Sequence, residues 1–228
     1  MNFKQGEILY FDKPYEWTSF DLVNRVRRIL TRHIGEKLKV GHAGTLDPLA
    51  TGVMILATGK STKRIEELQQ GVKEYIATLK FGATTPSFDM EHPENQWFPI
   101  DHISRDLIEG ILPRFCGEIM QVPPVYSAVK IDGKRAFDYA RKGDEVSLKA
   151  KPLKIDEIEI LDCSLPLLKL RIVCSKGTYI RALARDIGEA VGSGAYLTAL
   201  QRTRVGEVHL SECMTVEEFK EKIGYKQD

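Results

Sequence analysis

Apolar and polar residues follow two different periods in the first 82 residues of the chain. Between positions 18 and 32 apolar residues recur every three positions, which predicts an amphipathic helix with Thr18 or Ser19 as its N-cap. Between positions 73 and 82 they alternate with other residues, which predicts a strand with one buried face. The helical positions are Phe20, Val23, Val26 and Ile29, and the strand positions are Tyr75, Ala77, Leu79 and Phe81.

Strand-like and helix-like segments alternate along the rest of the chain. Strands are predicted over residues 8–14, 53–59, 125–131, 153–162, 166–174 and 204–210, and helices over 61–71, 104–113, 134–142, 178–191 and 215–223. Residues 84–102 are polar, acidic and proline-bearing, which is typical of a long loop. The strands outnumber those of simple βαβ winding, so we predict an α+β fold on a mixed, largely antiparallel central sheet. Because no linker or repeat divides the chain, we predict one domain over residues 1–228.

Charge is distributed unevenly along the chain, although the whole chain carries only +1. Residues 1–65 contain eleven Lys or Arg against six Asp or Glu, whereas residues 86–110 contain one against six. Residues 130–151 and 176–206 are also basic. If these basic segments meet in the fold, they form a face suited to a polyanion; if they do not, they are solvated helix faces.

Fragments of two nucleotide-binding motifs fail on spacing. Gly59-Lys60-Ser61 ends like a phosphate-binding loop, but Met54 stands where the first glycine belongs. Gly192-Ser193-Gly194 resembles a dinucleotide fingerprint, but Leu197 replaces the third glycine. There is no HExxH, HxxxH or CxxC pattern, so we predict no metal site. The remaining chemistry is expected from ordinary side chains.

Several segments carry an unusual density of glycine, proline, aromatic and charged residues. They are DKPYEWTSFD (12–21), GHAGTLDPLATG (41–52), KEY (73–75), VPPVYSAVKIDGKRAFDYARKG (122–143) and CSKGTYIRALARDIG (174–188). In order and spacing these segments resemble the bacterial tRNA pseudouridine synthase B family, from about residue 6 to residue 206. The resemblance implies the pseudouridine synthase fold, in which helices and loops around the central sheet form an RNA-binding cleft. It also implies isomerisation of the T-loop uridine at tRNA position 55.

The resemblance assigns roles to six residues. Asp47 matches the catalytic aspartate, and Arg181 matches the arginine that pairs with that carboxylate. Tyr75 matches the tyrosine that stacks on the target base, and His42 matches the histidine that contacts the RNA. Two further residues match positions that line the uridine pocket, Tyr179 and Leu200. Taken singly, each of the six also fits an ordinary structural role, such as a turn cap for Asp47 or a core position for Leu200.

The expected chemistry suits a carboxylate in an apolar pocket. The reaction breaks the N-glycosidic bond, turns the uracil and reattaches it through carbon 5, with no redox change. An ionised Asp47 can attack the ribose or stabilise positive charge at the anomeric carbon, as carboxylates do in glycoside hydrolysis. The base must first be flipped out of the RNA and held against an aromatic face, here Tyr75. Anomeric attack, addition to the uracil ring and a glycal route all remain open.

Two other functions compete with the synthase. A non-catalytic tRNA-binding protein or RNA chaperone would use the same basic surface without needing Asp47, and a glycoside or nucleoside hydrolase would release free base. The predicted partner is the T arm of tRNA, and the resemblance suggests a monomer without metal; that no organic cofactor is needed is implied only by the resemblance. The longest apolar run is far short of the roughly 20 residues of a membrane span, so we predict a cytoplasmic protein. Longer family members have a C-terminal RNA-binding domain, which is expected to be missing or vestigial here.

Overall fold

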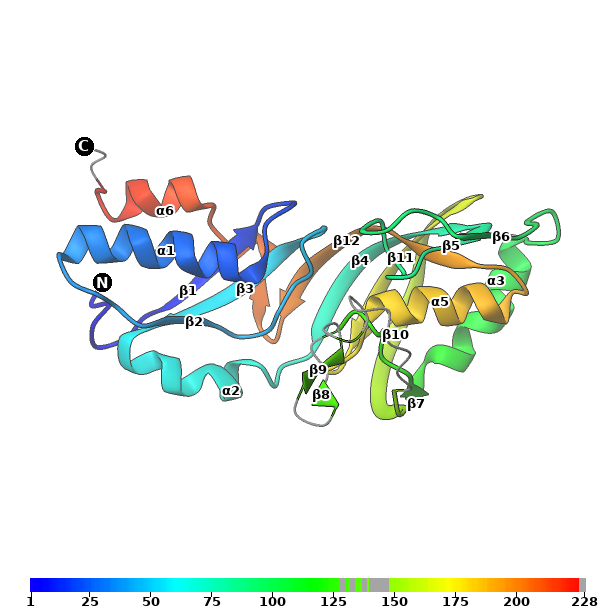
Figure 1. Cartoon of the computed structure of the whole chain (residues 1–228), viewed down its shortest axis with the longest axis horizontal. Coiled ribbons are helices and arrows are strands. Elements are labelled where there is room, and N and C mark those ends of the chain that lie inside the picture. Colours follow the sequence, from blue (N-terminus) through cyan, green and yellow to red (C-terminus); the bar gives the residue numbers. More distant parts are fainter. Residues whose placement is uncertain (128–129, 132–133, 137–138, 140–147, 226–228) are drawn as a thin grey trace. The chain divides into compact units, whose positions relative to one another are not determined.

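The structure is a computed structural model of the whole chain, and the residues it describes are 1–127, 130–131, 134–136, 139 and 148–225. The chain divides into two compact units, shown in Figure 1. The terminal unit comprises Met1–Tyr75 and Leu200–Asp228, and the central unit comprises Ile76–Ala199. The division falls inside two strands, β4 (Lys73–Phe81) and β12 (Ala195–Val205), so each unit contains part of both.

The terminal unit is built on β3 (Ala50–Thr58), a strand that is almost entirely buried. β1 (Ile8–Lys13) pairs with β3 in antiparallel register on one side. On β3, β12 pairs in parallel with residues 50–52, and β2 (Val40–His42) pairs antiparallel with residues 56–58. The unit also contains β13 (Val208–His209), η1 (Gly59–Arg64), α2 (Ile65–Leu68), η3 (Leu210–Glu212) and α6 (Val216–Lys222). Because successive side chains of a strand point to opposite faces of the sheet, the nearly continuous burial of β3 means that both faces are covered at this strand, which explains its apolar run.

The predicted first helix is confirmed as α1 (Ser19–Ile34), but one residue of its apolar face was predicted wrongly. Thr18 is the N-cap and forms a capping box with Asp21, and Gly35 ends the helix in the left-handed conformation. Phe20 is 63% exposed. A strict three-residue spacing drifts by about 60° per step around a helix of 3.6 residues per turn, so the first member of the series points away from the core. The buried face consists of Ser19, Leu22, Val23, Val26, Ile29 and Leu30.

The central unit contains the antiparallel part of the sheet. Its strands follow the order β12, β4, β11, β10 and β7, and the strands predicted over 153–162 and 166–174 pair antiparallel as β10 and β11. In β4 the alternation is confirmed, since Tyr75, Ala77, Leu79 and Phe81 are all buried. The remaining bounds are β5 (Ala83–Thr84), β6 (Gln96–Trp97), α3 (Arg105–Ile111), η2 (Leu112–Phe115), β7 (Gly117–Gln121), β8 (Lys130–Ile131), β9 (Lys134–Arg135), β10 (Lys151–Ser164), β11 (Leu167–Cys174) and α5 (Ile180–Ala190). The mixed, mostly antiparallel sheet predicted from the sequence is therefore confirmed.

Other predictions differ from the structure in the bounds of the elements. The strand predicted over 204–210 lies mainly at 195–205 as β12, and β7 and β2 were not predicted. The predicted loop 84–102 contains the short pair β5 and β6, with Trp97 exposed. Residues 134–135 form a strand where a helix was predicted to begin, and most of that helix lies outside the described residues. Short strands with few alternations give weak periodic signals. No helix among the described residues is long and apolar enough to cross a membrane.

Candidate active site

The loop that carries Asp47 connects β2 to β3 in the terminal unit. It ends in a turn in which the Ala50 amide donates to the Asp47 carbonyl at 3.1 Å, which fits the predicted turn. Gly44 and Gly52 have φ angles of 107° and 105°, a region that favours glycine. A Cβ on Gly52 would lie 2.2 Å from the carbonyl oxygen of Arg202. The glycine therefore allows β3 and β12 to approach each other at the base of the loop.

Arg202 holds the backbone of this loop from the neighbouring strand. Its side chain is buried, and it donates from Nε to the Val53 carbonyl at 2.8 Å. Its two terminal nitrogens donate to the carbonyls of Thr45 and Gly44, each at 3.3 Å. Because the planar guanidinium has several fixed donors, one side chain fixes three carbonyl groups before and after Asp47.

Ser19 and Lys13 hold the other side of the loop. The Ser19 hydroxyl accepts from the Leu46 amide at 2.8 Å and donates to the Leu46 carbonyl at 3.0 Å. The fully buried Lys13 ammonium donates to the carbonyls of Pro14, Trp17 and Pro48. The residues on both sides of Asp47 are thereby fixed by side chains of β1 and α1.

The electrostatic environment of Asp47 includes two buried cations. Burial lowers the pKa of Lys13 to about 8, while the carboxylates of Asp47 and Asp12 oppose this shift and Arg202 adds to it. Burial also raises the pKa of Asp12, whose carboxylate accepts from the Gly52 amide at 3.1 Å. These side chains influence one another, so Asp47 lies within one charged cluster of the terminal unit.

Three further residues predicted for the site also lie in the terminal unit. His42 is the last residue of β2, and burial lowers its pKa, opposed by a backbone hydrogen bond at Gly44 and aided by Arg202. Leu200 is aligned with Ala50 in the parallel pairing, which brings it to the end of the Asp47 loop. Tyr75 lies on β4 with only 8% of its surface exposed.

Arg181 lies in the central unit, at the start of α5, and is almost completely buried. Its Nε is 3.6 Å from Oδ2 of Asp89, and the two side chains are 6% and 7% exposed. The terminal nitrogens donate to the carbonyls of Ser87 at 3.2 Å and Tyr126 at 3.0 Å. The arginine therefore fixes the acidic loop 84–102 and the segment that follows Pro123-Pro124.

Tyr179 precedes α5 and is fixed through its backbone. The Tyr179 amide donates to Oε1 of Gln121 at 2.9 Å, and Nε2 of Gln121 donates to the Tyr179 carbonyl at 3.2 Å. Gln121 is 1% exposed, at the end of β7. These two hydrogen bonds fix the backbone of Tyr179 and thereby the position of its side chain.

The six predicted site residues thus fall into two groups. The terminal unit contains Asp47, His42, Tyr75 and Leu200, and the central unit contains Arg181 and Tyr179. The pairing of Arg181 with Asp47 stays a prediction. Sequence reasoning missed Lys13, Arg202 and Asp89, although all three lie in the charged segments that it had noted. Among the described residues, no three His, Cys, Asp or Glu side chains form a group that could hold a metal ion.

Comparison with known proteins identifies the family and the fold. Residues 27–180 match the model of the TruB family pseudouridylate synthase N-terminal domain, and residues 181–228 match that of the tRNA pseudouridylate synthase B C-terminal domain. The chain is thus of the pseudouridine synthase class. A solved chain of a Cbf5-Nop10-Gar1 complex has a TM-score of 0.72 at 28% identity and covers 99% of this chain, which spans 58% of that chain's length.

Curated bacterial proteins are similar over almost their whole length. A tRNA pseudouridine synthase B of Phocaeicola vulgatus is 66% identical over 228 residues, which are 100% of this chain and 97% of that protein. The protein of the same name from Bacteroides thetaiotaomicron is 63% identical, covering 98% of this chain and 95% of its own. The chain belongs to the TruB family.

Proposed function

We propose that this chain converts the uridine at position 55 in the T loop of tRNA to pseudouridine, with Asp47 as the catalytic carboxylate. That the chain is an enzyme making pseudouridine in tRNA follows from its family and from the curated relatives named for this activity. The position in tRNA and the role of each residue are the proposed part. The monomeric state stays a prediction from the sequence.

The observation that supports Asp47 is the fixed backbone on both sides of it. Arg202 binds the carbonyls of Gly44, Thr45 and Val53, and Ser19 binds Leu46. The Asp47 side chain is partly exposed, whereas the residues that fix the loop are buried. A carboxylate held in one place reacts with less loss of conformational freedom than one on a mobile loop.

The other site residues supply what a flipped uridine requires. Tyr75 offers an aromatic face for the base, and Leu200 offers an apolar wall at the end of the Asp47 loop. We propose that His42 contacts the RNA; burial lowers the pKa of this half-buried imidazole, which favours the neutral form that can donate or accept a hydrogen bond there without bringing a charge. We propose that Arg181 keeps Asp47 ionised and that Asp89, its buried partner, orients the guanidinium.

A tritium-release assay tests this function directly. T-arm RNA carrying tritium at uridine carbon 5 is incubated with wild type, with Asp47→Asn and with Asp101→Asn, an exposed carboxylate of the central unit. We expect release by wild type and Asp101→Asn, and a loss of about 10³-fold or more in Asp47→Asn, because a reacting group is removed. Replacing uridine 55 by cytidine should abolish release.

The outcomes separate the competing functions. Salt-sensitive RNA binding without tritium release from any protein would support a tRNA-binding protein or chaperone. Release of free uracil would indicate a hydrolase. Release that persists in the cytidine-55 RNA would place the reaction at another uridine.

A further inference from the structure

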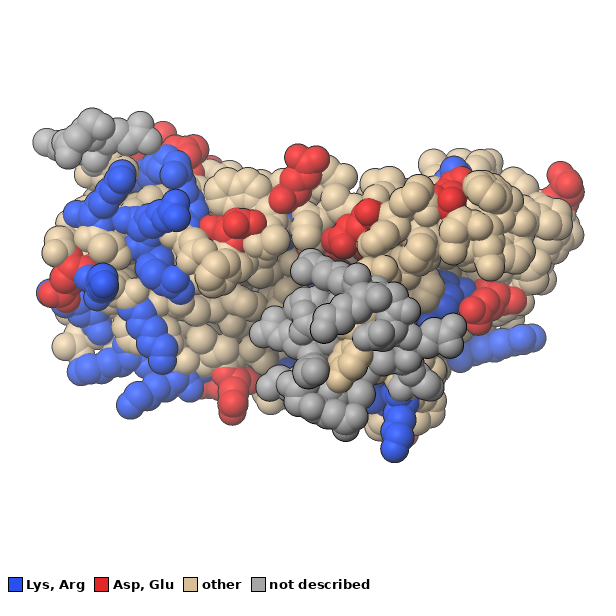
Figure 2. All heavy atoms as spheres, in the orientation of Figure 1, with Lys and Arg blue, Asp and Glu red and all other residues tan. Residues whose placement is uncertain are grey.

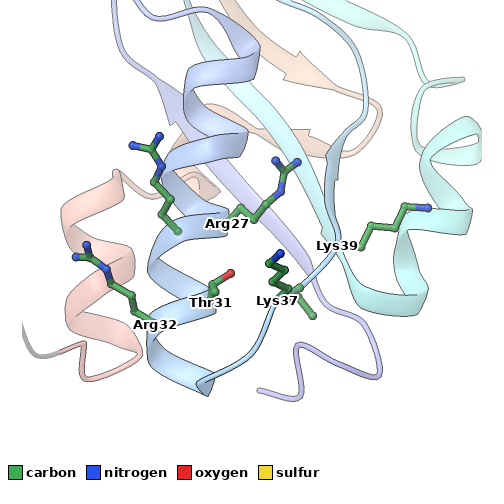
Figure 3. A pocket seen from close by; sticks show the side chains of 7 residues that line it. Arg27, Thr31, Arg32, Lys37 and Lys39 are labelled. Atoms are coloured by element: carbon green, nitrogen blue, oxygen red, sulfur yellow. The ribbon is translucent and has the colours of Figure 1, made fainter.

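A basic groove of about 540 Å³ lies on the terminal unit, apart from the Asp47 loop. The last two turns of α1 form one side, and residues 37–39, which lead into β2, form the other (Figure 3). Five of the seven lining residues are Lys or Arg and none is acidic. The groove is lined by Arg27, Arg28, Thr31, Arg32, Lys37, Leu38 and Lys39.

Only some of the cationic side chains of the groove have hydrogen-bond or ion-pair partners among the described residues. Arg27 is fixed, because it donates to Oδ1 of Asn24 at 2.8 Å and to the Val40 carbonyl at 3.0 Å. In the part of the chain that the structure describes, no carboxylate pairs with Arg28, Lys37 or Lys39. All three are exposed. Neighbouring like charges without counter-charges repel one another, so an anionic ligand would relieve an unfavourable arrangement.

Stabilisation of the helix end does not explain the cluster. Basic residues favour the last turn of a helix because of its partial negative charge, and this accounts for Arg32. Arg28 lies more than one turn before the end, and Lys37 and Lys39 follow the terminating Gly35 outside the helix. The effect also decays within one turn. Figure 2 shows that Lys and Arg side chains gather over this side of the terminal unit.

The position of the groove relative to Asp47 follows from the sheet register. The Lys39 carbonyl accepts from the Gly59 amide, just past the end of β3, whereas Asp47 bonds Ala50 at its start. At about 3.3 Å per residue, the nine steps from Ala50 to Gly59 separate the two places by about 30 Å. This corresponds to roughly nine base pairs of nucleic-acid duplex at about 3.4 Å per pair.

We infer that this groove binds backbone phosphates of the tRNA substrate outside the T loop. The inference rests on the proposed function, which puts the target uridine at Asp47. Ammonium and guanidinium groups contact phosphate oxygens without reading bases, so the groove would contribute affinity and orientation that are independent of sequence. Thr31 adds a neutral hydroxyl between the cations of α1 and Lys37 (Figure 3).

The test compares two sets of charge-neutral substitutions on two RNAs. The groove variant combines Arg28→Gln, Lys37→Gln and Lys39→Gln. The control variant combines Arg114→Gln, Lys151→Gln and Lys169→Gln, three exposed cations of the central unit, and removes the same charge. Dissociation constants are measured at several salt concentrations for whole tRNA transcript and for a hairpin that ends with the T stem.

We expect the Kd of the groove variant for whole tRNA to depend less on salt than that of wild type, and its Kd for the hairpin to keep the wild-type salt dependence. Each phosphate that is no longer neutralised lowers the slope of log Kd against log salt by about 0.7 to 0.9. An increase from 50 to 200 mM salt raises the Kd of wild type by some factor. With all three cations replaced, we expect this factor to be roughly 20 to 40 times smaller than in wild type. The control variant should keep the wild-type slope, and tritium release from saturating hairpin should be the same in all three proteins.

Three results would overturn the inference: a wild-type slope in the groove variant, an equal decrease of slope in both variants, or an equal decrease on the hairpin. Failure of the proposed function looks different. If wild type releases no tritium from either RNA while the groove variant alone has a lower slope on whole tRNA, the reaction assignment fails and the phosphate site stands. Circular dichroism of each variant confirms that the protein is folded.

Discussion

Two buried cations, Lys13 and Arg202, determine much of the geometry around Asp47. A buried charge is costly unless hydrogen bonds and opposite charges compensate it. Lys13 has three carbonyl acceptors and the nearby carboxylates of Asp12 and Asp47, and Arg202 has three carbonyl acceptors. Apart from the carbonyl of Val53 in β3, these carbonyls lie outside the strands and helices. The side chains of Lys13 and Arg202 therefore bind backbone carbonyls of the loop in the way that backbone amides do in strands and helices.

The lowered pKa of Lys13 makes stability depend on pH. In the unfolded chain the Lys13 ammonium keeps its proton up to its ordinary pKa of 10.5, whereas in the folded protein it loses the proton near pH 8. Between these values the unfolded state binds more protons, so the free energy of unfolding rises with pH. We expect this rise to be about 3 kcal/mol larger in wild type than in Lys13→Met. Urea denaturation at intervals from pH 7 to 10.5 measures it.

A second variant controls for the other groups that titrate in this range. Lys63→Met removes an exposed lysine of the same unit and should keep the wild-type pH dependence. Parallel curves for wild type and Lys13→Met would contradict the prediction, because Lys13 would then titrate alike in the folded and unfolded protein.

At the scale of elements, the parallel contact of β3 with β12 joins distant parts of the sequence. The register aligns Leu200 with Ala50 and Arg202 with Gly52. Gly52 permits this contact because it lacks a Cβ and adopts a positive φ. The same contact positions Leu200 at the loop and directs Arg202 towards its carbonyls. Gly52 thus allows the strand pairing that places Leu200 and Arg202 beside the Asp47 loop.

Substitution of Gly52 by alanine tests this connection. The new Cβ would meet the Arg202 carbonyl at 2.2 Å and would also strain the backbone, so we expect a loss of about 3 kcal/mol or more in the free energy of unfolding. Gly35→Ala provides the matched comparison, because Gly35 has a φ of 73° but its Cβ would meet nothing within 4 Å. Its expected cost is about 1 kcal/mol. Similar denaturation midpoints for the two variants would rule out the close approach as the cause.

At the scale of the whole molecule, both ends of the chain contribute to the terminal unit. Figure 1 marks the N and C ends there. Phe219 of α6 is fully buried, and its ring lies 5.3 Å from Phe11 and 6.2 Å from Phe3, both edge-on. Met214, which precedes α6, forms backbone hydrogen bonds with β1 beside Phe11. The last helix is therefore part of the core that supports the Asp47 loop.

Truncation of Phe219 measures how much the C-terminal helix contributes. We expect Phe219→Ala to lower the free energy of unfolding by about 3 to 5 kcal/mol, because it leaves a cavity between two aromatic rings. Phe20→Ala removes an exposed phenylalanine from α1 in the same unit and should cost less than about 0.5 kcal/mol. Equal losses in a urea titration would mean that the two rings are buried alike, contrary to the structure.

The sequence by itself determined the elements whose signals are local. The alternation of β4, the N-cap at Thr18 and the adjacent strands β10 and β11 are each set by neighbouring residues. The family motif also led to the prediction of Asp47 as the catalytic residue, because its glycines and Asp-Pro step lie within residues 41–52. Phe20 shows the limit of local reasoning, since spacing alone does not say which side of a helix meets the core.

Only the tertiary structure decided which distant side chains fix the site. Arg202 and Gly44 are 158 positions apart, and Arg181 and Ser87 are 94 positions apart. No local pattern marks such a pair, because the contact depends on the strand register and on helix placement. A charged residue in a sequence is ordinarily solvated, and only burial shows that Lys13, Arg202 and Asp89 are bound within the fold. The local sequence thus predicts the Asp47 loop, whereas the side chains that fix this loop come from distant positions and are known only from the packing.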